Sequence, residues 1–248
     1  MTTDLRLVGE LTVLRSKSMD DAEADYSWRI DPELASLDAT RPVTLSFTEY
    51  LRYHRDDVNY PSPWSVRMAI DTLDGRHIGN CMYYDINNEK SQCELGIMIG
   101  DRDYWSKGYG TDVVKSALTR IFTATELERV YLHTLTNNFR AQKSFAKAGF
   151  VAVREVKRDG YEFVLMEIWR KEWEAAHPGA QPGAQKEAEI SESAEKSPAP
   201  ARAQATSRAQ ATSQAQATSR AQATSQGKPI PCSALSTNQQ SNESEILL

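Results

Sequence analysis

The C-terminal part of the chain has no aromatic residue. The 5 Trp, 10 Tyr and 6 Phe residues all lie at or before Trp173. From Glu174 onward the sequence consists mainly of Ala, Gln, Ser, Thr, Pro and charged residues, which bury too little apolar surface to offset the entropy lost on ordering. The sequence therefore predicts one folded domain over residues 1–176 and a disordered, low-complexity tail over residues 177–248. The tail carries Ala-Gln-Ala-Thr-Ser repeats, which are either an extension without function or an interaction arm.

Cysteine and histidine are scarce and scattered. The three cysteines, Cys81, Cys93 and Cys232, form no pair with the spacing of metal ligands, and the four histidines are spread along the chain. A disulfide framework, a zinc site and a Ser/His/Asp triad are therefore all disfavoured. We expect no bound metal.

The sequence also lacks a long apolar run. No stretch approaches about 18 uninterrupted apolar residues, and no basic region followed by an apolar run stands at the N-terminus. The formal net charge of -5 disfavours non-specific attraction to nucleic acid. We therefore expect a cytoplasmic protein that binds neither membranes nor nucleic acid.

Hydrophobic patterns and turn signals predict a mixed α/β domain. Strands are expected at 5–15, 64–71, 77–84, 92–99, 129–136, 151–156 and 161–169, and helices at 19–28, 47–55, 108–125 and 138–148. The Asp31-Pro32 pair is expected to end the first helix. Turns at 74–75 and 87–88 join successive strands into an antiparallel meander, and a strand–helix–strand unit follows it. The predicted fold class is α/β, with a central, mostly antiparallel sheet, flanking helices and a β-α-β unit.

The loop before the longest predicted helix has the chemistry of an anion site. Residues 104–112 read Tyr-Trp-Ser-Lys-Gly-Tyr-Gly-Thr-Asp, between a strand and an amphipathic helix. Gly108 and Gly110 let the backbone approach a ligand closely, and the free N–H groups and positive dipole end of the helix attract a diphosphate. The pattern is neither a P-loop nor a Gly-x-Gly-x-x-Gly dinucleotide fingerprint. Two turn glycines without a ligand are the alternative interpretation.

Three further segments accompany this loop in a fixed order. Asn138-Phe-Arg-Ala141 opens the next helix, Lys147-Ala-Gly-Phe150 ends it, and Glu94-Leu-Gly-Ile-Met-Ile99 is the strand before the loop. Together with Trp-x-Lys-Gly-Tyr-x-Thr they resemble the GNAT superfamily of N-acetyltransferases, and in particular its ribosomal-protein branch. The resemblance covers about residues 5–173. It implies a GNAT-like fold and an acyltransferase that uses acetyl-CoA as its co-substrate.

The resemblance also implies which residues bind acetyl-CoA. They are Met98, Ile99, Trp105, Ser106, Lys107, Gly108, Tyr109, Gly110, Thr111 and Asn138. Met98 and Ile99 would offer backbone groups to the thioester and the pantetheine arm. Asn138 would contact the pantetheine arm, although its side chain also suits the N-cap of a helix. Arg140 is either a contact of the cofactor's 3′-phosphate or an ordinary exposed arginine.

Glu94 is the candidate catalytic base. Strand alternation puts Glu94 on the face opposite Leu95, and the resemblance places a functional glutamate in this strand. The expected reaction is a direct attack, in which an amine deprotonated by Glu94 through water attacks the thioester while a backbone N–H near Met98 stabilises the oxyanion. A solvated strand carboxylate without catalytic function is the alternative.

The chain departs from the family pattern at two positions. Trp105 stands where many relatives have Arg or Gln, and Phe145 stands where many have the tyrosine that protonates the leaving thiolate. The expected acceptor is a primary amine on a protein N-terminus, a polyamine or another small molecule such as an aminoglycoside. Phe145 keeps a second function open, that of a catalytically degenerate CoA-binding sensor or scaffold. A homodimer is open as well.

Overall fold

The computed structural model of the chain describes residues 5–179. The predicted tail lies outside the described residues apart from positions 177–179, as do Cys232 and the repeats, so the boundary at residue 176 stays a prediction. None of the helices in the described range combines the length and the apolar character needed to cross a membrane.

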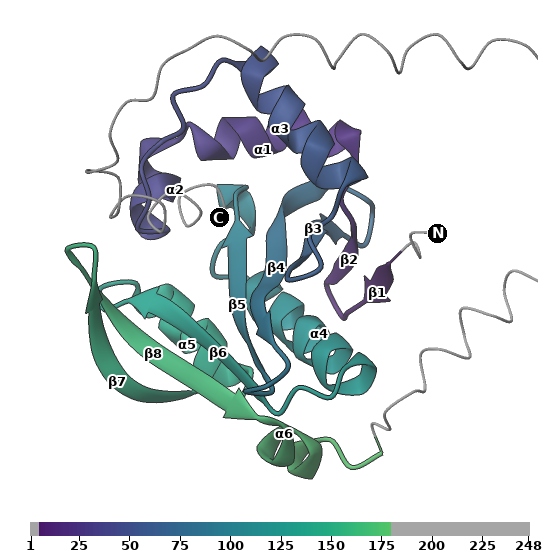
Figure 1. Cartoon of the computed structure of the whole chain (residues 1–248), viewed down its shortest axis with the longest axis vertical. Helices are drawn as coiled ribbons and strands as arrows, with labels where there is room; N and C mark the ends of the chain where they lie inside the picture. Colours follow the sequence, from purple (N-terminus) through teal and green to yellow (C-terminus); the bar gives the residue numbers. More distant parts are fainter. Residues whose placement is uncertain (1–4, 180–248) are drawn as a thin grey trace, which may run out of the picture. The chain divides into compact units, whose positions relative to one another are not determined.

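Within residues 5–179, eight strands form one sheet in the order β1-β2-β3-β4-β5-β6-β8-β7 (Figure 1). The strands are β1 (Arg6–Val8), β2 (Thr12–Ser16), β3 (Val66–Thr72), β4 (His77–Asn87), β5 (Gln92–Ile99), β6 (Arg129–Leu135), β7 (Val151–Arg158) and β8 (Tyr161–Trp169). Neighbouring strands pair antiparallel except β5 and β6, which pair parallel. The crossover that connects β5 to β6 contains helix α4 (Tyr109–Ala124). The predicted fold class is confirmed.

The helices form two groups around the sheet. In Figure 1 the first group lies together at the upper end of β5 and the second lies below it. The first group contains α1 (Ala22–Arg29), α2 (Pro32–Leu37), α3 (Phe47–Asn59) and the 3-10 turn η1 (Met19–Asp21). The second contains α4 and α5 (Phe139–Lys147). A second 3-10 turn, η2 (Arg102–Tyr104), precedes α4, and α6 (Arg170–Ala176) follows β8.

The hydrophobic core lies between α4 and the sheet. α4 buries Val113, Ala117 and Ile121 completely, at the spacing of one helical face. These side chains belong to one cluster with strand residues such as Leu95 and Val130. The core therefore holds the N-terminal end of α4, with the glycine loop before it, beside β5.

Residues 5–15, predicted as a single strand, form the β1–β2 hairpin instead. Asp112 near the start of α4 holds the turn: its Oδ1 accepts the N–H of Glu10 at 2.9 Å, and its Oδ2 accepts the N–H groups of Leu11 and Thr12 at 3.0 and 2.9 Å. The Thr12 hydroxyl adds a fourth hydrogen bond at 2.6 Å. Because the partner of this turn lies about a hundred positions away, the local pattern of residues 5–15 cannot reveal it.

The first helix ends before the Asp31-Pro32 pair, as predicted, but the same pair also begins a further helix. The Asp31 carboxylate accepts the N–H groups of Glu33 and Leu34 at 2.9 and 3.0 Å, and Pro32 takes the first helical position, where a missing N–H is harmless. The resulting helix, α2, was not predicted. It extends only from Pro32 to Leu37, too short to give a readable periodicity.

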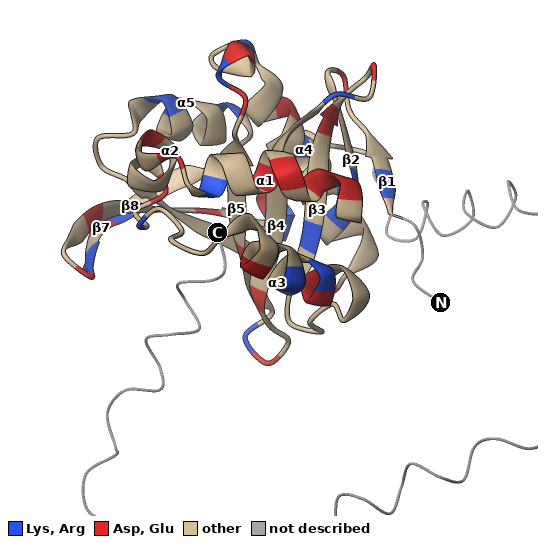
Figure 2. Cartoon of the chain, turned by 90° about the horizontal axis from the view of Figure 1, so that it is seen from above, with Lys and Arg blue, Asp and Glu red and all other residues tan. Residues whose placement is uncertain are grey.

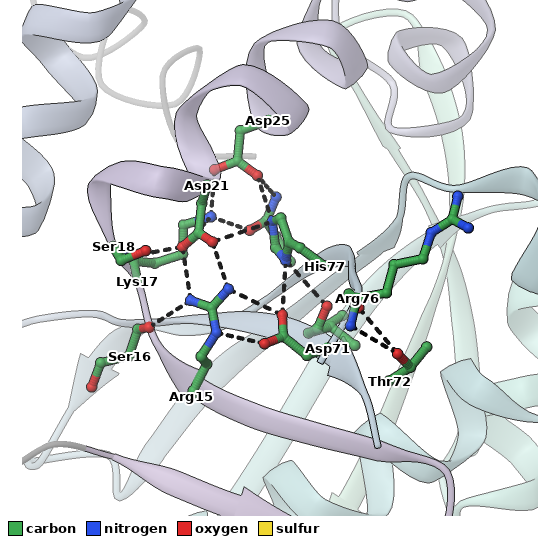
Figure 3. A network of polar contacts seen from close by, with 12 residues as sticks. Arg15, Ser16, Lys17, Ser18, Asp21, Asp25, Asp71, Thr72, Arg76 and His77 are labelled. Atoms are coloured by element: carbon green, nitrogen blue, oxygen red, sulfur yellow. Dashed lines mark hydrogen bonds and ion pairs between the residues drawn. The ribbon is translucent and has the colours of Figure 1, made fainter. Parts of the chain in front are cut away.

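A buried ion network attaches the first helical group to the sheet (Figure 3). Arg15 on β2 donates to Asp21 on η1 and to Asp71 on β3, each at 2.6 Å. His77 on β4 lies 3.2 Å from Asp71 and 3.2 Å from Asp25 on α1. Asp21 and Asp25 are almost completely buried, so their charges are compensated by these partners rather than by water.

Candidate active site

β5 and β6 diverge at Glu94. Parallel pairing joins Gln92–Glu94 to Arg129–Tyr131, and in the described part of the chain it goes no further. Beyond Glu94, β5 continues to Ile99 alongside β4. The sheet is therefore open beside the carboxyl end of β5.

A pocket of about 430 Å³ lies at this opening. Its walls come from the end of β5, the loop before α4, one face of α5 and the C-terminal end of α2. Eight of the predicted binding residues line it: Met98, Ile99, Trp105, Ser106, Gly108, Gly110, Thr111 and Asn138. Lys107, Tyr109 and Glu94 are not among the lining residues; Lys107 is exposed, and Tyr109 packs edge-on against Tyr104 with ring centroids 4.9 Å apart.

The glycine loop shapes the pocket at the start of α4. Gly108 is the N-cap and has a left-handed φ of +95°, a conformation that glycine adopts without strain. A Cβ at Gly110 would lie 3.3 Å from the Ser144 hydroxyl, which itself lies 2.9 Å from the Thr111 hydroxyl. The first N–H groups of a helix have no intrahelical partner. Such a start, with no Cβ in the way, fits a diphosphate.

Cations complete the same part of the pocket. Arg140, Lys143 and Lys147 of α5 line it, and Figure 2 shows basic residues on this helix. The Arg140 guanidinium lies over the Trp105 ring, 3.6 Å from its centroid, and partial burial lowers the pKa of Arg140. The Trp105 indole N–H in turn donates to the Ile99 carbonyl at 2.6 Å. Positive charge and free N–H groups together suit a phosphorylated ligand such as CoA.

Asn138 caps α5 as the sequence suggested. Its side-chain oxygen accepts the N–H of Ala141 at 3.2 Å, and the residue also lines the pocket. The two interpretations of Asn138, helix cap and ligand contact, are therefore compatible.

Glu94 is buried rather than solvated. Its side chain is 8% exposed, and Oε1 lies 2.8 Å from Nδ1 of His133 on β6. Burial, together with the neighbouring Glu94 charge, raises the pKa of Tyr84 on β4. Glu94 is thus not a solvated strand carboxylate, and its catalytic function stays a prediction. A proton transfer from an amine in the pocket to Glu94 requires an intervening water.

The strand cysteines are buried and protonated. Burial raises the pKa of both Cys81 and Cys93 to about 12. Neither supplies a thiolate at neutral pH, which disfavours an acyl-cysteine intermediate. Within residues 5–179, no group of three or more His, Cys, Asp or Glu side chains is arranged to hold a metal ion.

Asp38 is a charged residue of the pocket that the sequence did not predict. It directly follows α2 and lines the pocket with Leu34, Leu37 and Phe145. Burial raises the pKa of its carboxyl to about 6, although the Arg29 guanidinium at 3.8 Å opposes the rise. No motif marks Asp38, because its position depends on the unpredicted helix α2.

Known proteins resemble most of the part of the chain that the structure describes. The profile of the acetyltransferase (GNAT) domain matches residues 12–151. An uncharacterised N-acetyltransferase of Bacillus licheniformis, p20, is 25% identical over 170 residues, which are 64% of this chain and 95% of that protein. A probable spermine N(1)-acetyltransferase of Bacillus subtilis subsp. natto is 25% identical over 100 residues, 38% of this chain and 66% of that protein.

Solved structures share the fold. The spermidine N-acetyltransferase of Vibrio cholerae, solved with CoA and spermine, has a TM-score of 0.58 and 20% identity over 65% of this chain and 97% of that one. The aminoglycoside acetyltransferase AAC(6')-Ib, solved with coenzyme A, has a TM-score of 0.57 and 18% identity over 67% of this chain and 99% of that one. The profile match spans more than half of the chain. The chain therefore belongs to the GNAT family of acetyltransferases, and the predicted acetyl-CoA-dependent N-acetyltransferase is confirmed.

Proposed function

We propose that this protein moves the acetyl group of acetyl-CoA to a primary amine by direct attack within a ternary complex. The observation that carries the proposal is the pocket itself, which joins the glycine start of α4, the cations of α5 and the open edge of β5 in one space. Bound acetyl-CoA would supply the activated acetyl group. This chain would hold the diphosphate at Gly108 and Gly110, and the pantetheine arm beside Met98 and Asn138.

The proposed acceptor is a small polycationic amine. The relatives in complex structures bind spermine or act on aminoglycosides, and both classes carry several ammonium groups at neutral pH. A protein N-terminus, suggested by the likeness to the ribosomal-protein branch, is the other acceptor.

Glu94 is proposed as the base that removes a proton from the attacking nitrogen through water. Its support is its position at the point where β5 and β6 diverge, and its hydrogen bond to His133, which orients the carboxylate. His133 is a positioning residue in this scheme.

A second candidate function rests on Phe145. This side chain lines the pocket without a hydroxyl group that could protonate a thiolate. A GNAT domain that only binds CoA, as a sensor or scaffold, would have the same pocket.

Release of free thiol from acetyl-CoA separates the two functions. The full-length protein is incubated with acetyl-CoA and, in separate reactions, spermidine, spermine, kanamycin and a peptide with a free N-terminus. Thiol release that depends on the amine, with the acetylated amine seen by mass spectrometry, supports the enzyme. Tight CoA binding without amine-dependent release from any acceptor supports the sensor.

A further inference from the structure

The pocket contains one feature that neither the family motifs nor the proposed roles explain. Among the residues that the structure describes, Asp38 is the only carboxylate lining a pocket whose other charged residues are Arg140, Lys143 and Lys147. We propose that Asp38 receives the ammonium group of the acceptor and takes its first proton, so that the acceptor attacks as a neutral amine. This inference rests on the proposed acetyl transfer to an amine and names a second catalytic carboxylate for it.

The local fold holds Asp38 in one orientation. Asp38 is the C-cap of α2, and the chain after it closes a Schellman motif: the N–H of Ala39 donates to Ser36 at 3.3 Å and the N–H of Thr40 donates to Ala35 at 2.9 Å. The motif requires a left-handed residue, and Ala39 adopts it with φ +55° although alanine is strained there. Strained backbone of this kind persists where the surroundings demand it, and often does so at functional sites.

The other end of α2 is also fastened beside the pocket. Arg102 on η2 donates to Asp31 at 2.9 Å and to Glu33 at 2.7 Å, which ties the start of α2 to the segment that follows β5. η2 leads directly into the glycine loop. Asp38 is therefore positioned by the same part of the chain that forms the cofactor end of the pocket.

The surroundings of Asp38 leave its carboxylate able to accept a proton. In residues 5–179 its one ion pair is with Arg29 on α1, with 3.8 Å between Nη1 and Oδ2, and no side-chain hydrogen bond to the carboxylate is formed. Three apolar side chains, Leu34, Leu37 and Phe145, line the same pocket. Asp38 also lies at the C-terminal end of α2, where the partial negative charge of the helix dipole disfavours an ionised carboxylate. An arriving ammonium group would supply the missing partner.

Charge is distributed along the pocket in the order that the reaction needs. Arg140, Lys143 and Lys147 on α5 attract the phosphates of CoA and repel a polyamine, whereas Asp38 on the side of α2 does the reverse. An anionic donor and a cationic acceptor are thus directed to different walls of one space. Arg29 is the remaining cation near Asp38, and it sets how readily Asp38 takes a proton.

The proton balance assigns separate protons to Asp38 and Glu94. An ammonium acceptor loses two protons on the way to an amide: Asp38 takes the first before attack, and Glu94 takes the second through water as the C–N bond forms and the C–S bond breaks. Asp38 then passes its proton to the departing thiolate, whose greater basicity makes the transfer favourable. CoA-SH and the N-acetyl amine are the products, and the proton on Glu94 goes to the solvent. Asp38 thereby supplies the donor that Phe145 lacks.

The test is the pH dependence of kcat/KM with spermidine and kanamycin, from pH 5 to 10. The wild type is compared with Asp38→Asn, Arg29→Met and the control Asp56→Asn, which alters an exposed carboxylate on α3. The wild type should lose activity as the pH falls through about 6, where Asp38 becomes protonated. Asp38→Asn should lower kcat/KM at pH 7.5 by about 10²–10⁴-fold and abolish this loss near pH 6, the acid limb of the profile. Activity should recover in part near pH 10, where more of the amine is neutral. Arg29→Met should move the limb to higher pH.

Binding and stability separate a catalytic role from a structural one. Asp38→Asn should leave the melting temperature and the Kd for acetyl-CoA unchanged. The inference would be overturned if Asp38→Asn kept the wild-type kcat/KM and the same loss of activity at low pH. It would also be overturned if kcat/KM fell by the same factor at every pH and acetyl-CoA bound more weakly. If the wild-type protein acetylates none of the amines, the proposed function itself is refuted, before any variant is compared. Asp38 then has no ammonium group to deprotonate, and the inference is refuted with it.

Discussion

Gly108 is the residue on which the proposed diphosphate site depends most. Its φ of +95° lies in a region that a β-branched residue avoids, and a Cβ there would also lie 3.3 Å from the Leu11 side chain. Gly108→Val should therefore distort the start of α4 and weaken acetyl-CoA binding by about tenfold or more, from the left-handed strain alone. Calorimetric titration with acetyl-CoA measures the effect. Gly160→Val is the matched control, because Gly160 has φ +85° in the β7–β8 turn with nothing within 4 Å; equal affinities in the two variants would contradict the assignment.

For Glu94, the proposed base, we predict a loss of turnover without a loss of cofactor binding. Glu94→Gln keeps the size of the side chain and an oxygen that can accept from His133, but it removes the base. Turnover at neutral pH should fall by about 10²–10⁴-fold, while affinity for acetyl-CoA persists. Part of the loss should return at high pH, where hydroxide can take the proton that Glu94 would accept from the attacking nitrogen. Glu155→Gln, on an exposed position of β7, should have wild-type kinetics, and the same result for Glu94→Gln would exclude Glu94 as the base.

At the scale of elements, the β1–β2 hairpin and α4 form one unit through Asp112. This carboxylate is 8% exposed and accepts four hydrogen bonds from the hairpin turn. In Asp112→Asn one oxygen becomes an amide NH₂ facing N–H donors. The free energy of unfolding should fall by roughly 1–3 kcal/mol, the range for leaving a buried donor unpaired. Urea denaturation measures this, with Asp56→Asn as the control for an exposed helical carboxylate, and an unchanged midpoint for Asp112→Asn would show that the turn does not need it.

The elements that the sequence predicted correctly are those with a strong local signal. Ser46 opens α3 with a capping box, the Asp74-Gly75 turn joins β3 to β4, and the Gly-x-Gly loop precedes α4. The hairpin and α2 were missed for two physical reasons. The β1–β2 turn is held by Asp112 from far along the chain, and α2 depends on a cap and a proline that also occur in chain breaks. Because Asp38 is positioned by α2, the sequence could single out the glycine-loop residues that line the pocket but not its carboxylate.

At the scale of the whole molecule, an ion network joins three strands to η1 and α1, the elements that precede α2 and Asp38. Arg15 on β2 lies at its centre, between Asp21 and Asp71, and Lys17 lies 3.7 Å from Asp21 (Figure 3). Each of these carboxylates is buried, so breaking one pair leaves its partner charge without compensation. η1 and α1, which precede α2 in the chain, are thus attached to the sheet by contacts whose strength depends on the ionisation of aspartates.

This network predicts how the fold responds to acid. Burial alone would raise the pKa of Asp21, but the hydrogen bond from Arg15 and the charge of Lys17 lower it to about 2, below the ordinary value of 3.8. Since the folded state holds the proton less tightly than the unfolded state, Asp21 contributes stability above pH 4 and loses it as the pH falls toward 2. The contribution is about 2 kcal/mol.

Urea denaturation from pH 2.5 to 7 should show this loss in the wild type and in Asp56→Asn. Asp21→Asn should be less stable at pH 7, because Arg15 loses a partner, and its free energy of unfolding should fall less steeply between pH 4 and 2.5. An equally steep fall in Asp21→Asn would mean that other carboxylates account for the acid sensitivity. The Arg15–Asp21 pair would then not be what holds η1 to the sheet at low pH.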